Sequence, residues 1–247
     1  MSGSLVTPEL RARVRGLAVP VALAFGRMGL TPNALTVLGF GIAVIAAVAA
    51  AQQAWIAAGL LVIFGGVFDL FDGALARATN KVSRLGAFLD SVFDRAGEAV
   101  LYLGIAIGSL ASAFELGAIL AAAAMGASFM VSYTRAKSES LGFTPGTGMA
   151  NVGVAPREVR LIILTTGLIL TGIRGGAAPF AAIVCPANFG GCPEALVPHD
   201  GSTVLGLVLG IITILATITT IQRIVHVTRQ SPPESTSAAT PGGDQHP

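Results

Sequence analysis

The chain has 247 residues, of which 53% are hydrophobic and only 11% are charged. A soluble domain carries charged residues at roughly a quarter of its positions, so this composition excludes an ordinary soluble protein and indicates an integral membrane protein. The formal net charge is only +2, and nothing in the sequence suggests nucleic-acid binding.

The first predicted element is an amphipathic helix over residues 7–24, in which Arg11, Arg13 and Arg15 stand among Leu and Val. Such a helix lies in the membrane interface, and a disordered basic tail is the alternative. The apolar runs that follow are long enough to cross the hydrocarbon core, which takes about 20 residues. They predict six transmembrane helices, at residues 34–52, 54–80, 84–112, 115–140, 158–176 and 202–226.

The predicted fold class is therefore all-α integral membrane, with a single membrane domain over residues 1–229. Residues 230–247 are rich in Pro, Ser, Thr and Gly and contain too few apolar groups to pack. We expect this segment to be a disordered tail.

Basic residues on the predicted connections set the orientation in the membrane. They precede the first span, lie between the second and third and between the fourth and fifth, and close the sixth, which places them all on one side. The opposite connections are nearly free of Lys and Arg, apart from Arg174. Both termini are therefore predicted to be cytosolic, in a multi-pass protein of the plasma membrane. Loop 177–201 then faces outward, and its Cys185 and Cys192 form either a disulfide or two unpaired thiols.

The segment "DLFDGALARATNKVSRLGAFLDSVFD" (residues 69–94) concentrates acids in an otherwise apolar chain. At about 100° per residue, Asp69 and Asp72 lie on one helix face, together with the small residues Gly73 and Ala76 and the cation Arg77. On the next predicted helix, residues 86, 90 and 94 (Gly, Asp and Asp) are spaced by four and form one stripe. The short connection predicts that the two helices are antiparallel neighbours, so that both acid pairs meet at one depth near the cytosolic surface.

Four carboxylates that converge in a low-dielectric site repel one another, and divalent cations relieve the repulsion. Hard cations prefer carboxylate oxygens, so we expect Asp69, Asp72, Asp90 and Asp94 to bind two Mg²⁺ or Mn²⁺ ions whose shells are completed by phosphate oxygens. Three alternatives are structural ion pairs with the arginines at 77 and 95, a proton or cation pathway, and an Asp-rich prenyltransferase.

This segment resembles the signature of the CDP-alcohol phosphotransferase family at each of its fixed positions, and "LTPNALTVLG" (residues 30–39) is similar to that family's stretch at the start of the first span. The resemblance covers about residues 5–229. It implies that a CDP-linked lipid donates a phosphatidyl or archaetidyl group to an alcohol, that CMP leaves, and that the aspartates hold the metal ions. It also implies that Asp94 is the general base and allows a homodimer. The residues it places around the CDP-lipid are Pro32, Asn33, Gly73, Ala76, Arg77 and Ser83.

The stretches "SYTRAKSESLG" (132–142) and "APREVRLII" (155–163) resemble those of phosphatidylinositol phosphate synthases, in which basic residues hold the phosphate of inositol phosphate. The residues that match are Arg135, Lys137, Arg157 and Arg160, and Arg223 could join them. The sequence departs from that pattern in reading "PREVR", with a shifted proline. Glycerol 3-phosphate is the alternative acceptor, as in phosphatidylglycerophosphate synthases, and a divalent-cation or proton transporter is the competing class of function.

Overall fold

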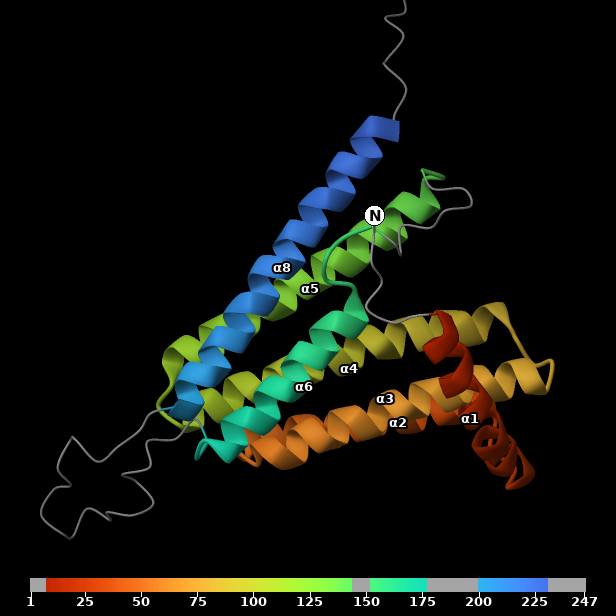
Figure 1. Cartoon of the computed structure of the whole chain (residues 1–247), viewed down its shortest axis with the longest axis horizontal. Helices are drawn as coiled ribbons and strands as arrows, with labels where there is room; N and C mark the ends of the chain where they lie inside the picture. Colours follow the sequence, from red (N-terminus) through yellow and green to blue (C-terminus); the bar gives the residue numbers. More distant parts are fainter. Residues whose placement is uncertain (1–7, 144–151, 177–199, 231–247) are drawn as a thin grey trace, which may run out of the picture.

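The structure, a computed structural model, describes residues 8–143, 152–176 and 200–230, and within these ranges the regular structure is entirely helical (Figure 1). Its helices are α1 (Pro8–Arg27), α2 (Pro32–Ala51), α3 (Trp55–Ala78), α4 (Arg84–Ala111), α5 (Glu115–Ser140), α6 (Arg157–Ile173) and α8 (Asp200–Gln230). The prediction of an all-helical protein is confirmed. Cys185, Cys192 and residues 231–247 of the predicted tail lie outside the described ranges.

Four of the described helices, α2, α3, α5 and α8, are long and apolar enough to cross a membrane. By contrast, α4 carries charged residues through its first half, and α6 has only 17 residues. The four long apolar helices indicate a membrane protein. The count of six spans, the interfacial position of α1 and the orientation stay predictions.

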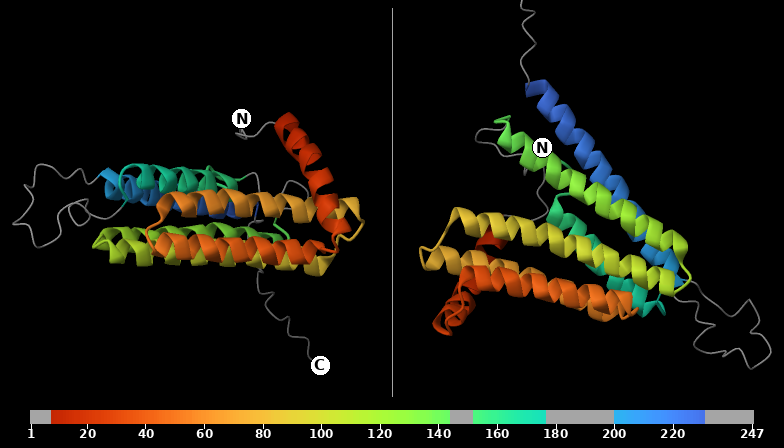
Figure 2. Two further views of the ribbon diagram at one scale, coloured as in Figure 1. Left: turned by 90° about the horizontal axis from the view of Figure 1, so that it is seen from below. Right: turned by 180° about the vertical axis from the view of Figure 1, so that it is seen from behind.

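The helices form two layers, with α2, α4 and α5 in one and α3, α6 and α8 in the other (Figure 2). The layers meet where α2 packs against α3 and where α5 packs against α8. Toward the C-terminal end of α3 and the N-terminal end of α4, helices α5 and α8 diverge from the rest, and α6 lies in the wedge between them (Figure 1). The middle helices of the two layers, α4 and α6, face one another across this wedge.

A buried apolar cluster and close contacts at small residues hold the helices together. The main buried cluster includes Trp55, Leu101, Ile105, Leu164, Leu168, Leu205 and Leu209. Within one layer, Gly104 and Gly108 of α4 lie directly against the main chain of Ala47 and Ala50 of α2. Small residues at such contacts allow helix backbones to approach closely inside a membrane.

The first helix, α1, crosses the C-terminal half of α3 at a steep angle (Figure 1). The contact is a second buried cluster that includes Ala18, Ala22, Leu35, Ala74 and Leu75. The following turn is fixed by Thr31, whose Oγ1 accepts a hydrogen bond from the backbone N–H of Ala34 at 3.2 Å, as an N-cap does. α1 and the start of α2 are thereby held at the end of α3 that carries Asp69 and Asp72.

The prediction that residues 54–80 and 84–112 pack as neighbours is wrong. The corresponding helices, α3 and α4, run antiparallel, but they belong to different layers and do not pack along one another. Instead α2 packs against both, with Ala47 and Ala50 close to α4 and Gly39 close to Phe68 of α3. The space between α3 and α4 is therefore bounded by α2 and α6, and the acidic residues face it.

Candidate active site

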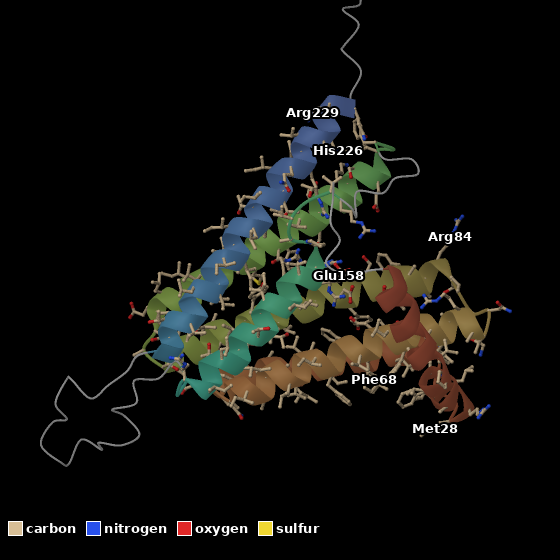
Figure 3. The ribbon with its side chains drawn as sticks, in the orientation of Figure 1. Met28, Phe68, Arg84, Glu158, His226 and Arg229 are labelled. Carbon is tan, nitrogen blue, oxygen red and sulfur yellow. The ribbon has the colours of Figure 1, made fainter. Side chains whose placement is uncertain are left out.

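A cavity of about 770 Å³ lies beside the C-terminal half of α3. Asp69 and Asp72 of α3 and Asp90 of α4 line it, and Ala18 and Val19 of α1 supply an apolar wall. The other lining residues are Leu70, Gly73, Ala74, Arg77, Ala78 and Glu158. Figure 3 shows Glu158 at the start of α6, on the side where the helices diverge. Three of the four predicted metal-binding aspartates therefore share one cavity with a cation and an apolar surface.

The fourth aspartate, Asp94, is joined to Asp69 by Arg157 of α6. Nη1 of Arg157 lies 2.7 Å from Oδ2 of Asp94, and Nη2 lies 3.2 Å from Oδ2 of Asp69. Asp69 lines the large cavity and also a smaller one, of about 60 Å³, that Asp94 and Arg157 line as well. Because the side chains of Arg157 and Asp94 are 26% and 14% exposed, a ligand can reach both of them.

Asp72 is buried and is oriented by a residue that the sequence analysis did not single out. Thr36 of α2 donates a hydrogen bond from Oγ1 to Oδ2 of Asp72 at 2.7 Å. Thr36 lies in the "LTPNALTVLG" stretch, four residues after Pro32, so the stretch itself was a signal. The contact fixes one carboxylate oxygen of Asp72, a residue that also lines the large cavity.

The acidic residues suit hard divalent cations, because they offer carboxylate oxygens from two different helices. Asp69 and Asp94 already flank a positive charge, the guanidinium of Arg157, which shows that a cation fits between them. Within the described ranges, however, no group of three or more His, Cys, Asp or Glu side chains is arranged as a metal site. The convergence of all four aspartates on metal ions therefore stays a prediction.

Only some of the residues predicted to surround the CDP-lipid line the large cavity. Gly73 and Arg77 line the large cavity, whereas Pro32, Asn33, Ala76 and Ser83 are not among its lining residues. Ser83 caps α4, since its Oγ accepts a hydrogen bond from the backbone N–H of Gly86 at 3.0 Å. Asn33 lies against the same turn, because a Cβ on Gly86 would stand 3.2 Å from its Oδ1.

Of the four basic residues predicted to bind the acceptor, the structure brings Arg157 to the aspartates. Arg135 and Lys137 are exposed near the end of α5, and Nε of Arg135 donates to Oε1 of Glu139 at 2.9 Å. Arg223, the additional candidate, donates instead to the backbone carbonyl oxygens of Val131 and Val152.

Arg160 is buried and paired with Glu98 of α4, which the sequence analysis did not select. Its Nη2 lies 3.0 and 3.1 Å from the two carboxylate oxygens of Glu98, and Nε lies 3.2 Å from Oε1. The two side chains are only 1% and 3% exposed, and removing one partner of such a pair costs about 3–5 kcal/mol. Glu98 extends the four-residue spacing of Asp90 and Asp94, a signal that was available in the sequence.

The family model of the CDP-alcohol phosphatidyltransferases matches residues 29–229. The chain belongs to this family. The phosphatidyltransferase is 35% identical over 168 residues to the archaetidylinositol phosphate synthase of Pyrococcus horikoshii, an alignment that covers 68% of this chain and 85% of the relative. It is 32% identical over 213 residues to the phosphatidylinositol phosphate synthase of Cutibacterium acnes, covering 85% of this chain and 91% of the relative.

Solved structures of the phosphatidylinositol phosphate synthase of Mycobacterium tuberculosis are also similar to this phosphatidyltransferase. The structure with CDP-DAG bound has a TM-score of 0.67 and 25% identity, covering 85% of this chain and 92% of the relative. The complex with manganese and citrate has a TM-score of 0.66 and 26% identity, covering 85% of this chain and 88% of the relative.

The resemblance seen in residues 69–94 is thus confirmed. The protein is an enzyme, a CDP-alcohol phosphatidyltransferase of phospholipid synthesis, from a family that uses divalent cations. The competing hypothesis of a cation or proton transporter is set aside.

Proposed function

We propose that this phosphatidyltransferase transfers a phosphatidyl or archaetidyl group from a CDP-linked lipid to inositol phosphate and releases CMP. The observation that carries the proposal is the position of Arg157, a half-buried guanidinium beside Asp94. Its Nε is buried and has no hydrogen-bond partner, so this guanidinium keeps one unsatisfied donor beside the site. The relatives named as inositol phosphate synthases support the choice of acceptor.

The CDP-lipid occupies the large cavity in this proposal. Ala18 and Val19 present an apolar wall to the lipid, while Arg77 offers a planar pair of donors to phosphate. Gly73 lies under the guanidinium of Arg77, since a Cβ there would stand 3.2 Å from Nη1. The remaining residues of the donor site are those at the starts of α2 and α4 and on α3, namely Pro32, Asn33, Ala76 and Ser83.

Asp69, Asp72, Asp90 and Asp94 would hold divalent cations, either Mg²⁺ or Mn²⁺, with two ions in each site. When bound, these ions would neutralise the diphosphate and stabilise the charge that develops on the departing CMP. Thr36 would support metal binding indirectly, because its hydrogen bond holds the buried carboxylate of Asp72 in one orientation.

The reaction itself depends on the closeness of Asp94 and Arg157. An acceptor whose phosphate is bound by Arg157 presents its hydroxyl group close to Asp94, because the two side chains are in contact. Asp94 takes the hydroxyl proton, the acceptor oxygen bonds to the lipid-side phosphorus, and the bond from that phosphorus to the CMP oxygen breaks. Both substrates are thereby held in one geometry before the chemical step.

Two further basic residues belong to the approach to the site. Arg135 and Lys137 are exposed on α5 and would attract or bind a phosphorylated acceptor. Arg160, which was predicted from the sequence to join them, is instead buried against Glu98. We further propose six spans, both termini and the active site on the cytosolic side, and a homodimer, as the positive-inside pattern and the family resemblance imply.

The test is a panel of acceptors, with CMP release measured in detergent with CDP-diacylglycerol and Mn²⁺ or Mg²⁺. We expect inositol phosphate to be the best acceptor and free inositol to be at least about a hundredfold poorer, because a site built for a charged group rejects an analogue that lacks it. Glycerol 3-phosphate as the best acceptor would instead indicate a phosphatidylglycerophosphate synthase. Equal rates with free and phosphorylated inositol would contradict the role of Arg157.

Replacing Thr36 with Val should raise the Mn²⁺ concentration needed for half-maximal activity about tenfold, because Asp72 loses the hydrogen bond that orients it. Thr36→Ser should restore the wild-type value. The matched control is Thr213→Val, since the Thr213 hydroxyl donates only to the carbonyl of Leu209, at 2.8 Å. An unchanged Mn²⁺ requirement in Thr36→Val would show that the hydrogen bond does not serve metal binding.

A further inference from the structure

Two ion pairs, one turn apart, connect α4 and α6. The outer pair is Asp94 with Arg157, and the inner pair is Glu98 with Arg160. On α4 the acids are four residues apart, and on α6 the arginines are three residues apart, so each helix contributes successive turns to the two pairs. The backbones of α4 and α6 do not pack along one another. α6 packs against α3 and α8, and the two ion pairs add direct side-chain contacts between α6 and α4 near the site.

The inner pair is much less exposed than the outer pair, although Glu98 lines the small cavity together with Asp94 and Arg157. Arg160 and Glu98 are 1% and 3% exposed, whereas Arg157 and Asp94 are 26% and 14% exposed. The guanidinium of Arg160 uses Nε and Nη2 for Glu98, and its Nη1 donates to the carbonyl oxygen of Ala155 at 3.2 Å. These contacts leave Arg160 no exposed surface for an acceptor.

The same contacts hold the segment that leads into α6. Ala155 accepts a hydrogen bond from Arg160, and its own N–H donates to Oγ1 of Thr219 on α8 at 3.0 Å. The first turn of α6 is therefore held from two sides, by α4 through Glu98 and by α8 through Thr219. Arg157 is in that first turn, so its position relative to Asp94 follows from these contacts.

We propose that Glu98 and Arg160 are positioning residues for the acceptor. They act by fixing the first turn of α6, and with it the position of the Arg157 guanidinium relative to Asp94. The inference rests on the proposed function, in which Arg157 binds the acceptor phosphate. A guanidinium displaced by about 1 Å would move the acceptor hydroxyl away from its base, and misplacements of that size cost up to about a hundredfold in rate. The donor cavity does not include Glu98 or Arg160 in its lining, so binding of the CDP-lipid should be unaffected.

The experiment is a double-mutant cycle on the full-length enzyme in detergent, with Arg160→Lys, Arg157→Gln and the two combined. For each variant, kcat and the KM values for inositol phosphate and CDP-diacylglycerol are measured. We expect Arg160→Lys to lower kcat and to raise the acceptor KM about tenfold, and to leave the donor KM within about twofold. When Arg160→Lys is added to Arg157→Gln, the acceptor KM should not rise further, because a residue that acts only through Arg157 has nothing left to position.

A second variant separates a positioning effect from a loss of folding. Glu98→Gln combined with Arg160→Gln removes both charges of the buried pair together, so neither is left buried and unpaired. Arg95, whose Nη1 lies 3.8 Å from Glu98, loses this partner but is 27% exposed. The monodispersity of the variant is checked by size exclusion. The variant should show the same selective rise in acceptor KM. The matched control is Tyr102→Phe, one turn deeper on α4, which removes a buried hydroxyl 3.5 Å from Ser128 of α5. This control should leave both KM values unchanged.

The outcomes separate the inference from the proposed function. Independent, additive effects of Arg160 and Arg157 on the acceptor KM would show that Arg160 contacts the acceptor itself and would overturn the inference. Equal changes in both KM values, or a loss of thermal stability with unchanged KM values, would show a purely structural pair and would also overturn it. If Arg157→Gln alone leaves the acceptor KM unchanged, the proposed acceptor site is wrong and the inference falls with it.

Discussion

Replacing Asp94 with Asn is expected to reduce the rate of CMP release about a thousandfold, within the range that a general base contributes. Asparagine has nearly the same shape and can still accept a hydrogen bond from Arg157, which lies 2.7 Å from the carboxylate. It cannot take a proton from the acceptor hydroxyl. The measurement is CMP release at saturating concentrations of both substrates, together with binding of CDP-diacylglycerol, which should be largely retained.

The control for this prediction is Glu115→Gln, which neutralises an exposed acid in the first turn of α5, at the opposite end of α4 from Asp94. It should leave turnover unchanged. Raising the Mn²⁺ concentration separates the two roles proposed for Asp94. If excess Mn²⁺ restores the rate of Asp94→Asn, the residue acts only as a metal ligand, and a near-normal rate without added metal would contradict both roles.

The features that could be predicted from the sequence are those that depend on local spacing. Helix boundaries follow from the length of apolar runs, and the placement of Asp69 and Asp72 on one face follows from 3.6 residues per turn. The cavity that Asp69, Asp72 and Asp90 share agrees with this reasoning. These properties need no knowledge of which helices pack together.

The features that could not be predicted depend on contacts between distant parts of the chain. Thr36 and Asp72 are 36 residues apart, and Glu98 and Arg160 are 62 residues apart. The apolar pattern of a span does not specify its neighbours, which explains why α3 and α4 were expected to pack directly although α2 packs against both. A short connection fixes only that two helices run antiparallel.

The arginines of "REVR" (residues 157–160) show this limit within one motif. Both are basic, both lie on the first turns of α6, and both match the basic positions of related synthases. They differ because the acids they meet on α4 lie at different depths, Asp94 near the opening and Glu98 in the interior. Only the three-dimensional arrangement shows that Arg157 meets the partly exposed acids Asp69 and Asp94, whereas Arg160 is buried against Glu98.

Asp72→Asn is expected to lower activity about a hundredfold at limiting Mn²⁺, because the substitution removes a negative charge from a buried ligand position. Asparagine can still accept the hydrogen bond from Thr36, so the fold should be retained. Part of the activity should return as Mn²⁺ is raised, since a weakened site refills at higher ion concentration. The measurement is the Mn²⁺ dependence of CMP release after the enzyme has been stripped with a chelator.

Comparing the Mn²⁺ dependence of Asp72→Asn with that of Thr36→Val tests whether the Asp72 carboxylate binds the ion. A carboxylate that binds the ion should matter more than the hydroxyl that orients it, so both variants should shift the Mn²⁺ dependence in one direction, with Asp72→Asn shifted further. Wild-type enzyme treated with chelator gives the baseline of no metal, which Asp72→Asn should approach at low Mn²⁺. If Asp72→Asn instead keeps the wild-type Mn²⁺ dependence, its carboxylate is a buried hydrogen-bond acceptor for α2 and the ions are held by the other aspartates.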